Sequence, residues 1–235
     1  MKPEEIKQQG GKIVIIGAGE FGRIAYDYFN VDSNYEVVAF AVENKFLEKT
    51  AYCEIPVIAF EELPERYPPS DFDVFVALTY GHLNRDRSRL VEMSRQAGYR
   101  SVSYLSSSAF VSPNISIGEN TFVFENNTIQ HLCQLEDNVI LWSGNHVGHR
   151  SVIRKNCFIS SHVVISGFCD IGDNCFVGVN STIGNNLTIG KDCTIGAGSI
   201  ITSDLLENSS IAPPKSPVRE NISRRLWKVR DNGMD

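Results

Sequence analysis

The sequence lacks several features that would define a protein class at once. No apolar run approaches the roughly 18 residues that a membrane span needs. The N-terminal segment MKPEEIKQQGGK is polar and has no apolar core of the kind found in secretory signals. Basic residues do not predominate, because 22 Lys and Arg stand against 28 Asp and Glu, and this argues against nucleic acid as the main partner. We therefore expect a cytoplasmic protein that has no membrane span.

The first hundred residues alternate short apolar runs with helix-like stretches. Runs of strand length and composition occupy residues 13–16, 37–42 and 74–78, and the clearest helical stretch is 84–97. Strands that alternate with helices are typical of a parallel sheet. We expect residues 1–107 to form a small Rossmann-like α/β domain.

From about residue 108 a period of six replaces this pattern. Sixteen consecutive positions six residues apart are Val, Ile or Leu, often followed by Gly: Val111, Ile117, Val123, Ile129, Leu135, Leu141, Val147, Ile153, Ile159, Ile165, Ile171, Val177, Ile183, Ile189, Ile195 and Ile201. A period of six is that of the hexapeptide β-solenoid, in which each hexad supplies a short strand with one inward aliphatic residue and then a corner. The hexads resemble those of the left-handed parallel β-helix, with three hexads in each 18-residue coil. We expect that fold over residues 108–235, which include a C-terminal tail.

Five of the six cysteines fall in one phase of the repeat, two residues before an aliphatic position: Cys133, Cys157, Cys169, Cys175 and Cys193. In other hexads this phase holds residues such as Ala109, Thr121, Ser151, Ser181 and Ser199. We interpret the phase as a tight inward slot in which Cys acts as a small buried hydrophobe. A metal or redox cluster is the alternative. With no export signal in the sequence, we expect reduced thiols and no disulfides.

Two segments resemble a known family. The loop Gly17-Ala18-Gly19-Glu20-Phe21-Gly22 precedes an unbroken hexapeptide domain, and Val147-Gly148-His149-Arg150-Ser151-Val152-Ile153 is similar to the family's Val-Gly-His-Asp-x-Val-Ile. The chain resembles the bacterial nucleotide-sugar acyltransferases, which include bacillosamine and perosamine N-acetyltransferases and sialic-acid O-acetyltransferases. The resemblance implies a homotrimer with active sites between adjacent β-helices, which transfers an acyl group from acetyl-CoA during surface-polysaccharide (O-antigen) or glycan precursor synthesis.

The glycine-rich loop follows a predicted strand and opens a helix, so its backbone N–H groups can cradle a phosphate. Such a loop usually indicates a dinucleotide, and Glu43 stands where a ribose-binding acid belongs. However, a hundred residues are too few for both halves of a dinucleotide fold. The resemblance implies that the loop holds the diphosphate of a nucleotide sugar. The candidate residues for this substrate are Gly17, Gly19, Glu20, Phe21, Gly22, Glu43, Asn44, Asn84, Arg85, His131 and His146.

Several of these candidates leave alternatives open. Where the family has paired Asp after the second strand, this chain has Glu43 and Asn44, so the base is not defined. Asn84 and Arg85 are expected either to contact substrate or to serve as a helix cap and a solvated charge. His131 and His146 are expected either to contact substrate or to be exposed edge residues.

His149 matches the family's catalytic histidine, and the resemblance implies that it is the general base. Because His131 stands 18 residues earlier, we expect the two imidazoles to stack on successive coils. Gly167 stands one coil later, where its N–H is expected to stabilise the oxyanion. The family commonly has an acid after this histidine, but here the residue is Arg150, so the partner that orients His149 is not identified.

The acetyl-CoA site is expected along the last coils, where the resemblance places the pantetheine arm on main-chain groups. Many members have a second histidine nine residues after the catalytic one; here that residue is Phe158, and His162 follows. His162 either substitutes for that histidine or hydrogen-bonds its own turn. The run that contains Pro214 and Lys215 resembles the family's closing segment near the adenine. The candidate residues are Phe158, His162, Gly178, Gly196, Ala197, Gly198, Pro214 and Lys215.

Acyl transfer to a nucleotide-linked amino sugar is the leading hypothesis, and sugar O-acetylation is its nearest variant. A γ-type carbonic anhydrase shares the β-helix, but the spacing of His131, His146 and His149 does not match its three zinc ligands, and no metal is expected. A non-catalytic nucleotide-sugar-binding homologue is the third possibility.

Overall fold

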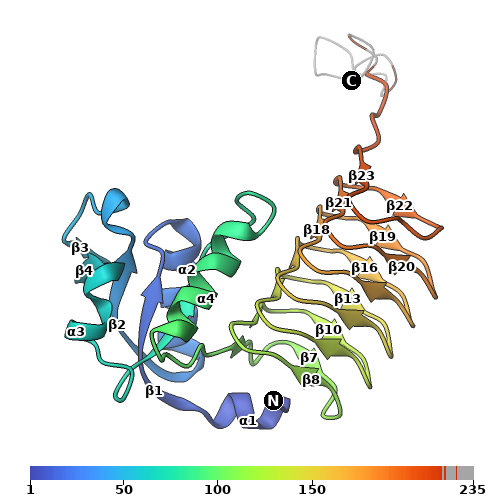
Figure 1. The fold of residues 1–235 in the computed structure, drawn as a ribbon. Helices are drawn as coiled ribbons and strands as arrows, with labels where there is room; N and C mark the ends of the chain where they lie inside the picture. Colours follow the sequence, from blue (N-terminus) through green and yellow to red (C-terminus); the bar gives the residue numbers. More distant parts are fainter. Residues whose placement is uncertain (219, 221–225, 227–235) are drawn as a thin grey trace, which may run out of the picture.

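The computed structural model describes residues 1–218, 220 and 226 of the 235-residue chain. Residues 219, 221–225 and 227–235 of the expected C-terminal tail lie outside the described residues. Figure 1 shows an α/β domain beside a ladder of short parallel strands that rises from β7 and β8 to β23.

The first domain is built on one sheet in the order β3-β4-β2-β1-β5, in which all neighbours are parallel except β3 and β4. Its elements are α1 (Pro3–Gln8), β1 (Gly10–Ile16), α2 (Glu20–Asp32), β2 (Asn34–Val42), η1 (Asn44–Phe46), β3 (Ala51–Tyr52), β4 (Ile55–Ala59), η2 (Phe60–Glu62), α3 (Leu63–Arg66), β5 (Asp73–Val76) and α4 (Arg85–Gln96). The predicted strands at 13–16, 37–42 and 74–78 are the adjacent strands β1, β2 and β5, of which β5 lies at the edge of the sheet. The predicted helix at 84–97 is α4.

The second domain consists of two-residue strands that form three parallel sheets. Sheet one contains β7 (Phe110–Val111), β10 (Thr128–Ile129), β13 (His146–Val147), β16 (Val164–Ile165), β19 (Thr182–Ile183) and β22 (Ile200–Ile201). Sheet two contains β8 (Ser116–Ile117), β11 (Gln134–Leu135), β14 (Val152–Ile153), β17 (Asp170–Ile171) and β20 (Thr188–Ile189). Sheet three contains β6 (Tyr104–Leu105), β9 (Phe122–Val123), β12 (Ile140–Leu141), β15 (Phe158–Ile159), β18 (Phe176–Val177), β21 (Thr194–Ile195) and β23 (Ser210–Ile211).

The period of six is confirmed at every predicted position. Each of the sixteen aliphatic residues is the second residue of its strand, and strands pair with the strands 18 residues away, as Ile129 does with Val147. The side chain before each aliphatic residue points to the other face of the sheet, because strand side chains alternate. The fold is therefore the expected Rossmann-like domain followed by a left-handed parallel β-helix.

Three corners join the sheets, and each turns through a residue at positive φ, three positions after the aliphatic residue. Asn is the commonest residue there because it tolerates the left-handed region. The histidine corner, between sheets one and two, carries His131, His149, Gly167 and Asn185. The asparagine corner, between sheets two and three, carries Asn120, Asn138, Asn156, Asn174 and Asp192. The glycine corner, between sheets three and one, comprises residues 143–144, 160–162, 178–180 and 196–198.

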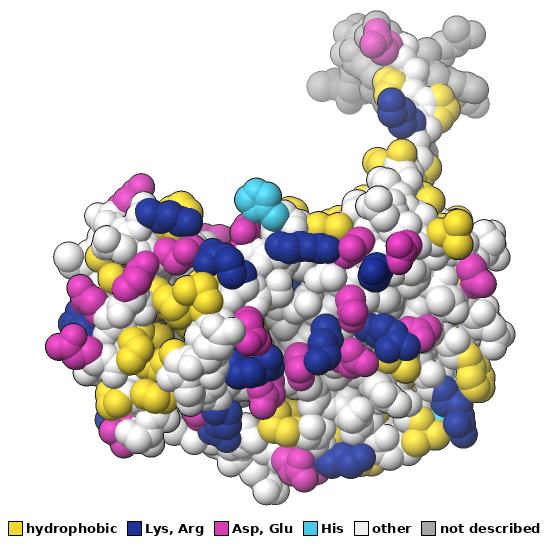
Figure 2. All heavy atoms as spheres, in the orientation of Figure 1, with side chains coloured by type: hydrophobic (Ala, Val, Ile, Leu, Met, Phe, Trp, Pro, Cys, Tyr) yellow, Lys and Arg dark blue, Asp and Glu magenta, His cyan; other side chains and the backbone are white. Residues whose placement is uncertain are grey.

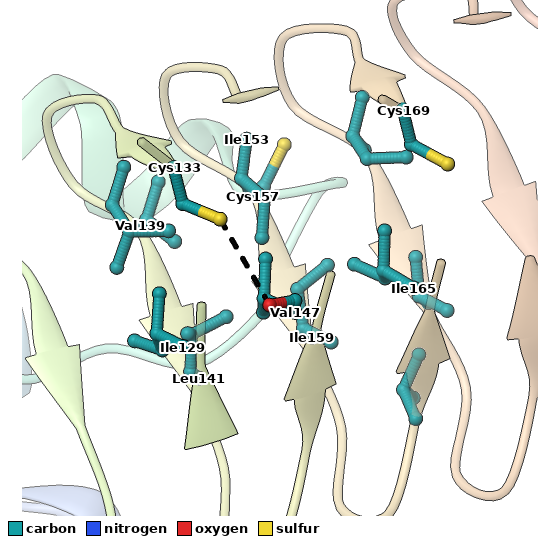
Figure 3. Packing of buried hydrophobic residues seen from close by; sticks show 14 of the residues in the cluster. Ile129, Cys133, Val139, Leu141, Val147, Ile153, Cys157, Ile159, Ile165 and Cys169 are labelled. Carbon is teal, nitrogen blue, oxygen red and sulfur yellow. Dashed lines mark hydrogen bonds between the residues drawn. The ribbon is translucent and has the colours of Figure 1, made fainter. Parts of the chain in front are cut away.

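The cysteine slot is also confirmed. All five slot cysteines are buried and unbridged, and Figure 3 shows Cys133, Cys157 and Cys169 pointing into the same core as the aliphatic residues. Each thiol donates to a carbonyl of the next coil, as Cys157 does to Gly172 (3.1 Å), and the Ser181 hydroxyl does the same to Gly196 (3.0 Å). Burial raises the pKa of the Cys157 thiol. These thiols are packing residues, because nothing exposes them to a reagent or a metal.

The two domains are joined by a fully buried arginine in α4, Arg87. Its guanidinium has no carboxylate partner among residues 1–218, 220 and 226, and it donates to neutral oxygens on both domains. In the α/β domain these are the Thr79 carbonyl (2.6 Å), the Leu78 carbonyl (3.3 Å) and Asn84 Oδ1 (3.2 Å). In the β-helix, Nε donates to Asn138 Oδ1 (2.9 Å) and Nη2 donates to the Asn156 carbonyl (2.9 Å).

The asparagine corner forms a ladder of amides that meets this arginine. Asn120 donates to Asn138, Asn138 to Asn156 and Asn156 to Asn174, each amide to the oxygen one coil later at 2.8 to 3.1 Å. Asn174 then donates to Asp192 (3.1 Å). At its other end, Asn120 Oδ1 accepts the N–H of Val76 in β5 (2.8 Å). The ladder therefore docks the corner onto both α4 and β5.

Charged pairs and aromatic rings surround this buried contact. Arg95 of α4 lies near Glu119 (3.6 Å) and Asp137 (3.8 Å) of the β-helix, and Figure 2 shows Lys and Arg side chains beside Asp and Glu side chains across this face. Phe122 of sheet three packs among rings of the α/β domain, including Phe21 (ring centroids 5.5 Å apart) and Phe75 (5.3 Å). Sheet three is thus the face of the β-helix that the first domain covers.

We predict that Arg87→Met lowers the free energy of unfolding by more than about 3 kcal/mol, because several buried carbonyls lose their only charged donor. Urea denaturation followed by fluorescence measures this loss. Arg95→Met is the matched control on the same helix; its exposed ion pairs should be worth less than about 1 kcal/mol. Equal stability of the two variants would show that the buried arginine does not hold the domains together.

Candidate active site

The glycine-rich loop is shaped by close approach of its backbone. Gly17 has φ +115°, and a Cβ there would lie 2.9 Å from the Ala77 carbonyl oxygen. A Cβ on Gly22 would lie 2.1 Å from the Gly17 oxygen, so Gly22 lets α2 pack against the loop. A Cβ on Gly19 would meet nothing within 4 Å. The loop therefore presents bare backbone at Gly19 and at the N-terminus of α2, where an anion is favoured.

A cavity of about 370 Å³ opens beside this loop at the ends of β1 and β2. It is lined by Ile16, Gly17, Ala18, Gly19, Ala41, Val42, Glu43, Phe46, Glu48, Leu78 and Leu90. Glu43 thus lies where the sequence placed it. Arg89, which sequence reasoning missed, donates to both Glu43 carboxylate oxygens (2.7 and 3.0 Å) and holds the pKa of Glu43 below its usual value. Asn44 is absent from the lining, and its N–H donates to Glu61 (3.0 Å).

A second cavity, of about 340 Å³, lies between the start of α2 and sheet three. It is lined by Glu20, Phe21, Ile24, Thr79, Tyr80, Trp142, Phe158, Ser160, Ser161 and Val179. Both domains contribute to it, and most of these side chains are apolar or aromatic. The cavity joins the exposed Glu20 of the loop to Ser160 and Ser161 of the glycine corner.

Three candidates belong to the domain interface. The Asn84 side chain is fully buried; its amide donates to the Asn174 carbonyl (3.0 Å) and its oxygen accepts from Arg87, so it has no surface for substrate. Arg85 pairs with Asp192 (2.6 Å). Phe158 is 2 % exposed and packs against Tyr80 (5.0 Å). The expected substrate contact of Asn84 is therefore wrong, since burial closes it to ligand.

Phe158 was expected at the acetyl-CoA site, and its burial corrects this expectation. Its side chain projects from sheet three beneath the α/β domain, away from the column of small residues in the last coils. The same burial applies to Phe21, which packs against Phe122, Phe124 and Trp142. Both phenyl groups form part of the wall of the second cavity.

His149 lies at the histidine corner in a defined orientation. Its ring stacks on His131 as the spacing predicts, with centroids 5.5 Å apart and planes 7° apart. Phe168 contacts it edge to face at 5.0 Å. Gln130 Oε1 lies 2.9 Å from the backbone nitrogen of His149 and 3.1 Å from Nδ1. Sequence reasoning missed Gln130, and only the stacking of successive coils brings it to the histidine.

Gly167 has no side chain and so leaves space for the His149 ring. A Cβ on Gly167 would lie 2.7 Å from His149 Cε1 and 2.9 Å from Nε2. Its N–H, however, donates to Asn185 Oδ1 (3.0 Å). In this structure the N–H therefore faces Asn185, and its expected role toward an oxyanion stays a prediction.

The histidine corner differs from the other corners in its left-handed residues. Leu132, Arg150 and Phe168, each 18 residues from the next, have φ of 60°, 58° and 60°, where Asn or Gly stands in most coils. Phe168 is 52 % exposed despite its size. A residue other than glycine pays a conformational free-energy cost in the left-handed region, and such residues are concentrated at functional sites. The three side chains flank His131 and His149 with exposed apolar and cationic groups.

The acetyl-CoA candidates other than Phe158 gather along the glycine corner and its continuation. His162 (φ 58°) and Gly198 (φ 70°) occupy corresponding turns two coils apart. A Cβ on Gly144 would lie 2.6 Å from His162 Nδ1, so this imidazole lies across the preceding coil. Cβ atoms on Gly178 and Gly196 would lie 2.6 and 2.5 Å from backbone nitrogens of the next coil, so both glycines are needed for stacking. Ala197, Pro214 and Lys215 are exposed there.

Sheet one separates the glycine corner from the histidine corner. His149 lines neither of the two cavities beside the glycine-rich loop. The outward residues of sheet one include exposed Phe110, Val164 and Ile200 in one column, with half-buried His146 in register between Thr128 and Val164. Within one chain, the loop and the histidine therefore belong to different sides of the β-helix.

Comparisons with known proteins match both domains. Residues 12–93 match the PglD N-terminal domain, and residues 168–203 match the bacterial transferase hexapeptide (six repeats). The expected resemblance to the nucleotide-sugar acyltransferases is confirmed. No curated protein sequence matches the chain.

Solved structures resemble the whole described fold. The acetyltransferase domain of PglB from Neisseria gonorrhoeae FA1090 is 26% identical with a TM-score of 0.79, over 88% of this chain and 99% of that one. The same domain in complex with acetyl coenzyme A has the same identity and score, over 89% and 100%. PerB from Caulobacter crescentus, in complex with CoA and GDP-perosamine, is 26% identical with a TM-score of 0.76, over 85% and 93%.

Two further features were sought in the part of the chain that the structure describes. It holds no group of three or more His, Cys, Asp or Glu side chains placed to bind a metal ion. None of its helices is long and apolar enough to span a membrane.

We predict that Gly167→Ala lowers kcat at least about 100-fold with little change in thermal stability, because the added methyl group displaces the His149 ring from a productive position. Steady-state kinetics and a melting curve measure both effects. Gly184→Ala is the matched control, since its Cβ would meet only ordinary contacts at 3.4 and 3.6 Å. Equal activity of the two variants would contradict the role given to Gly167.

Proposed function

We propose that the protein is an acetyl-CoA-dependent N-acetyltransferase that acts on a nucleotide-linked amino sugar. The observation that carries this proposal is the combination in one chain of a bare glycine loop beside a cavity and an oriented histidine on a hexapeptide β-helix. The likeness to PglB in complex with acetyl coenzyme A and to PerB in complex with CoA and GDP-perosamine supports both substrates.

The loop from Gly17 to Gly22 binds the diphosphate through backbone N–H groups, and the cavity that Glu43 lines receives the nucleoside. The sugar extends away from α2, and acetyl-CoA lies along the glycine corner. His149 Nε2 accepts a proton from the amine as its nitrogen attacks the thioester carbonyl. The tetrahedral intermediate then collapses, the C–S bond breaks, and protonated His149 returns the proton to the CoA sulfur, which leaves as the free thiol.

The working enzyme is a homotrimer, as the resemblance to the nucleotide-sugar acyltransferases implies. An active site shared between two copies accounts for a chain that keeps the loop and the histidine on different sides of its β-helix. The exposed Phe110, Val164 and Ile200 of sheet one support contact with a second copy there. Such a contact brings the histidine corner of one chain to the acetyl-CoA and sugar held by its neighbour. Two corners that are apart in one chain thereby form one site.

We place this reaction in the cytoplasm, where nucleotide sugars are prepared for surface polysaccharides such as O-antigen or for other glycans. The nucleotide, the hexose and the acylated carbon are left to the experiment. Sugar O-acetylation uses the same base and donor and differs only in the attacking atom.

A thiol-release assay tests the proposal, with acetyl-CoA and a panel of UDP-, dTDP- and GDP-linked amino sugars and their hydroxyl counterparts. We expect turnover with an amino sugar and its loss by at least about 100-fold in His149→Ala. Turnover confined to a hydroxyl counterpart would replace N-acetylation by O-acetylation. No turnover with any sugar of the panel, in protein that does not bind CoA, would contradict the proposal and favour a non-catalytic binding protein.

A further inference from the structure

The contact between Gln130 and His149 determines where the imidazole carries its hydrogen. The backbone N–H of His149 is a fixed donor, so the Gln130 atom 2.9 Å from it must be the amide oxygen and not the amide nitrogen. The same oxygen lies 3.1 Å from His149 Nδ1. Because an amide oxygen can only accept, a hydrogen bond at this contact requires the hydrogen on Nδ1.

We propose that Gln130 is a positioning residue that holds neutral His149 as the Nδ1–H tautomer and leaves Nε2 as the proton acceptor. The proposal rests on the proposed function for its kinetic consequences but not for the tautomer itself. It supplies the orienting partner that the sequence did not identify.

Among the described residues, Gln130 is the partner that the structure places at Nδ1. Arg150, which follows His149, has no acceptor atom to offer. His131 lies parallel to one face of the ring and Phe168 meets it edge to face, so both limit its tilt without bonding Nδ1. A Cβ on Gly167 would lie 2.7 Å from Cε1, 2.9 Å from Nε2 and 3.1 Å from Nδ1, so the missing side chain leaves room beside the ring. The ring is thus held at Nδ1 and has space beside Nε2.

The use of a neutral amide has a chemical consequence. A carboxylate at Nδ1 would stabilise the imidazolium that forms when Nε2 takes the proton, whereas an amide oxygen orients the ring without a negative charge. A carboxylate in place of Gln130 should therefore keep the geometry and make His149 easier to protonate. Protonated His149 cannot act as a base, so activity would then fail at a higher pH.

Nitrogen NMR of the full-length protein labelled with ¹⁵N-histidine tests the tautomer without any substrate. At a pH above the usual histidine titration range, His149 should show a protonated Nδ1 and an unprotonated Nε2. Its signals are identified by their loss in His149→Asn. A protonated Nε2 in the wild-type protein would overturn the proposal, and so would an unchanged tautomer in Gln130→Met.

Kinetics with the active nucleotide sugar provide the second readout. We expect Gln130→Met to lower kcat on the order of 100-fold with little change in the KM for acetyl-CoA. Gln130→Glu should recover most of kcat at its optimum and move the acidic limb of the pH profile to higher pH by roughly one unit. The matched control is Gln134→Met, at an exposed position of β11.

The two tests separate this proposal from the proposed function. Full activity in Gln130→Met, or an unmoved acidic limb in Gln130→Glu, would overturn the role of Gln130 while acetyl transfer stands. An Nδ1–H tautomer that depends on Gln130, in a protein without turnover on any sugar, would support the positioning role and remove the proposed function.

Discussion

The structure depends on a buried charged group that has no counterion in the part of the chain that the structure describes. Burial lowers the pKa of Arg87 to about 9, so the guanidinium stays protonated at neutral pH and must be solvated entirely by the protein. Carbonyl and amide oxygens from both domains provide that solvation. The ladder of stacked asparagines holds these oxygens in place, because each amide is already bonded to the coils before and after it. An arrangement that left some of these buried hydrogen bonds unmade would cost free energy, so the contact favours one relative position of the two domains.

The relative position of the two domains determines which corner of the β-helix lies beside the glycine-rich loop. With α4 on the asparagine corner and the first domain over sheet three, the second cavity reaches from the glycine-rich loop to the glycine corner. His149 and the residues that orient it lie across sheet one, at the histidine corner. The buried contact at Arg87 therefore keeps His149 of one chain away from the glycine-rich loop of the same chain. The exposed apolar column of sheet one is the feature that a second copy would cover.

The repeat was predictable from the sequence because every hexad faces the same environment. The inward residue of each hexad is aliphatic and buried, so the period of six persists through all the coils. The stacking of His131 on His149 followed from the same 18-residue coil. The glycine loop was predictable from its Gly-x-Gly-x-x-Gly spacing between a strand and a helix, although the contact that excludes a side chain at Gly17 comes from the distant Ala77.

Other residues were not predictable because their roles arise from contacts between distant segments. Arg87 stands on an ordinary polar helix, and only the docked β-helix makes it a buried clamp. The hexad pattern shows that Phe158 points outward but not that another domain covers it. Gln130 reaches His149 across a coil boundary, and Asn185 takes the Gly167 N–H in the same way. Such pairings depend on side-chain length and rotamer, which a periodic pattern does not encode.

Complementation between subunits tests the central claim, that one catalytic site uses two chains. His149→Ala lacks the base but keeps the loop, and Gly19→Asp places a negative charge where phosphate binds at a position with free space for a side chain. We predict that each variant alone is inactive and that the two co-expressed in equal amounts recover about a quarter of wild-type activity, as random assembly of a cyclic trimer requires. Co-expressed variants no more active than either one alone would show that the loop and the histidine act within a single chain.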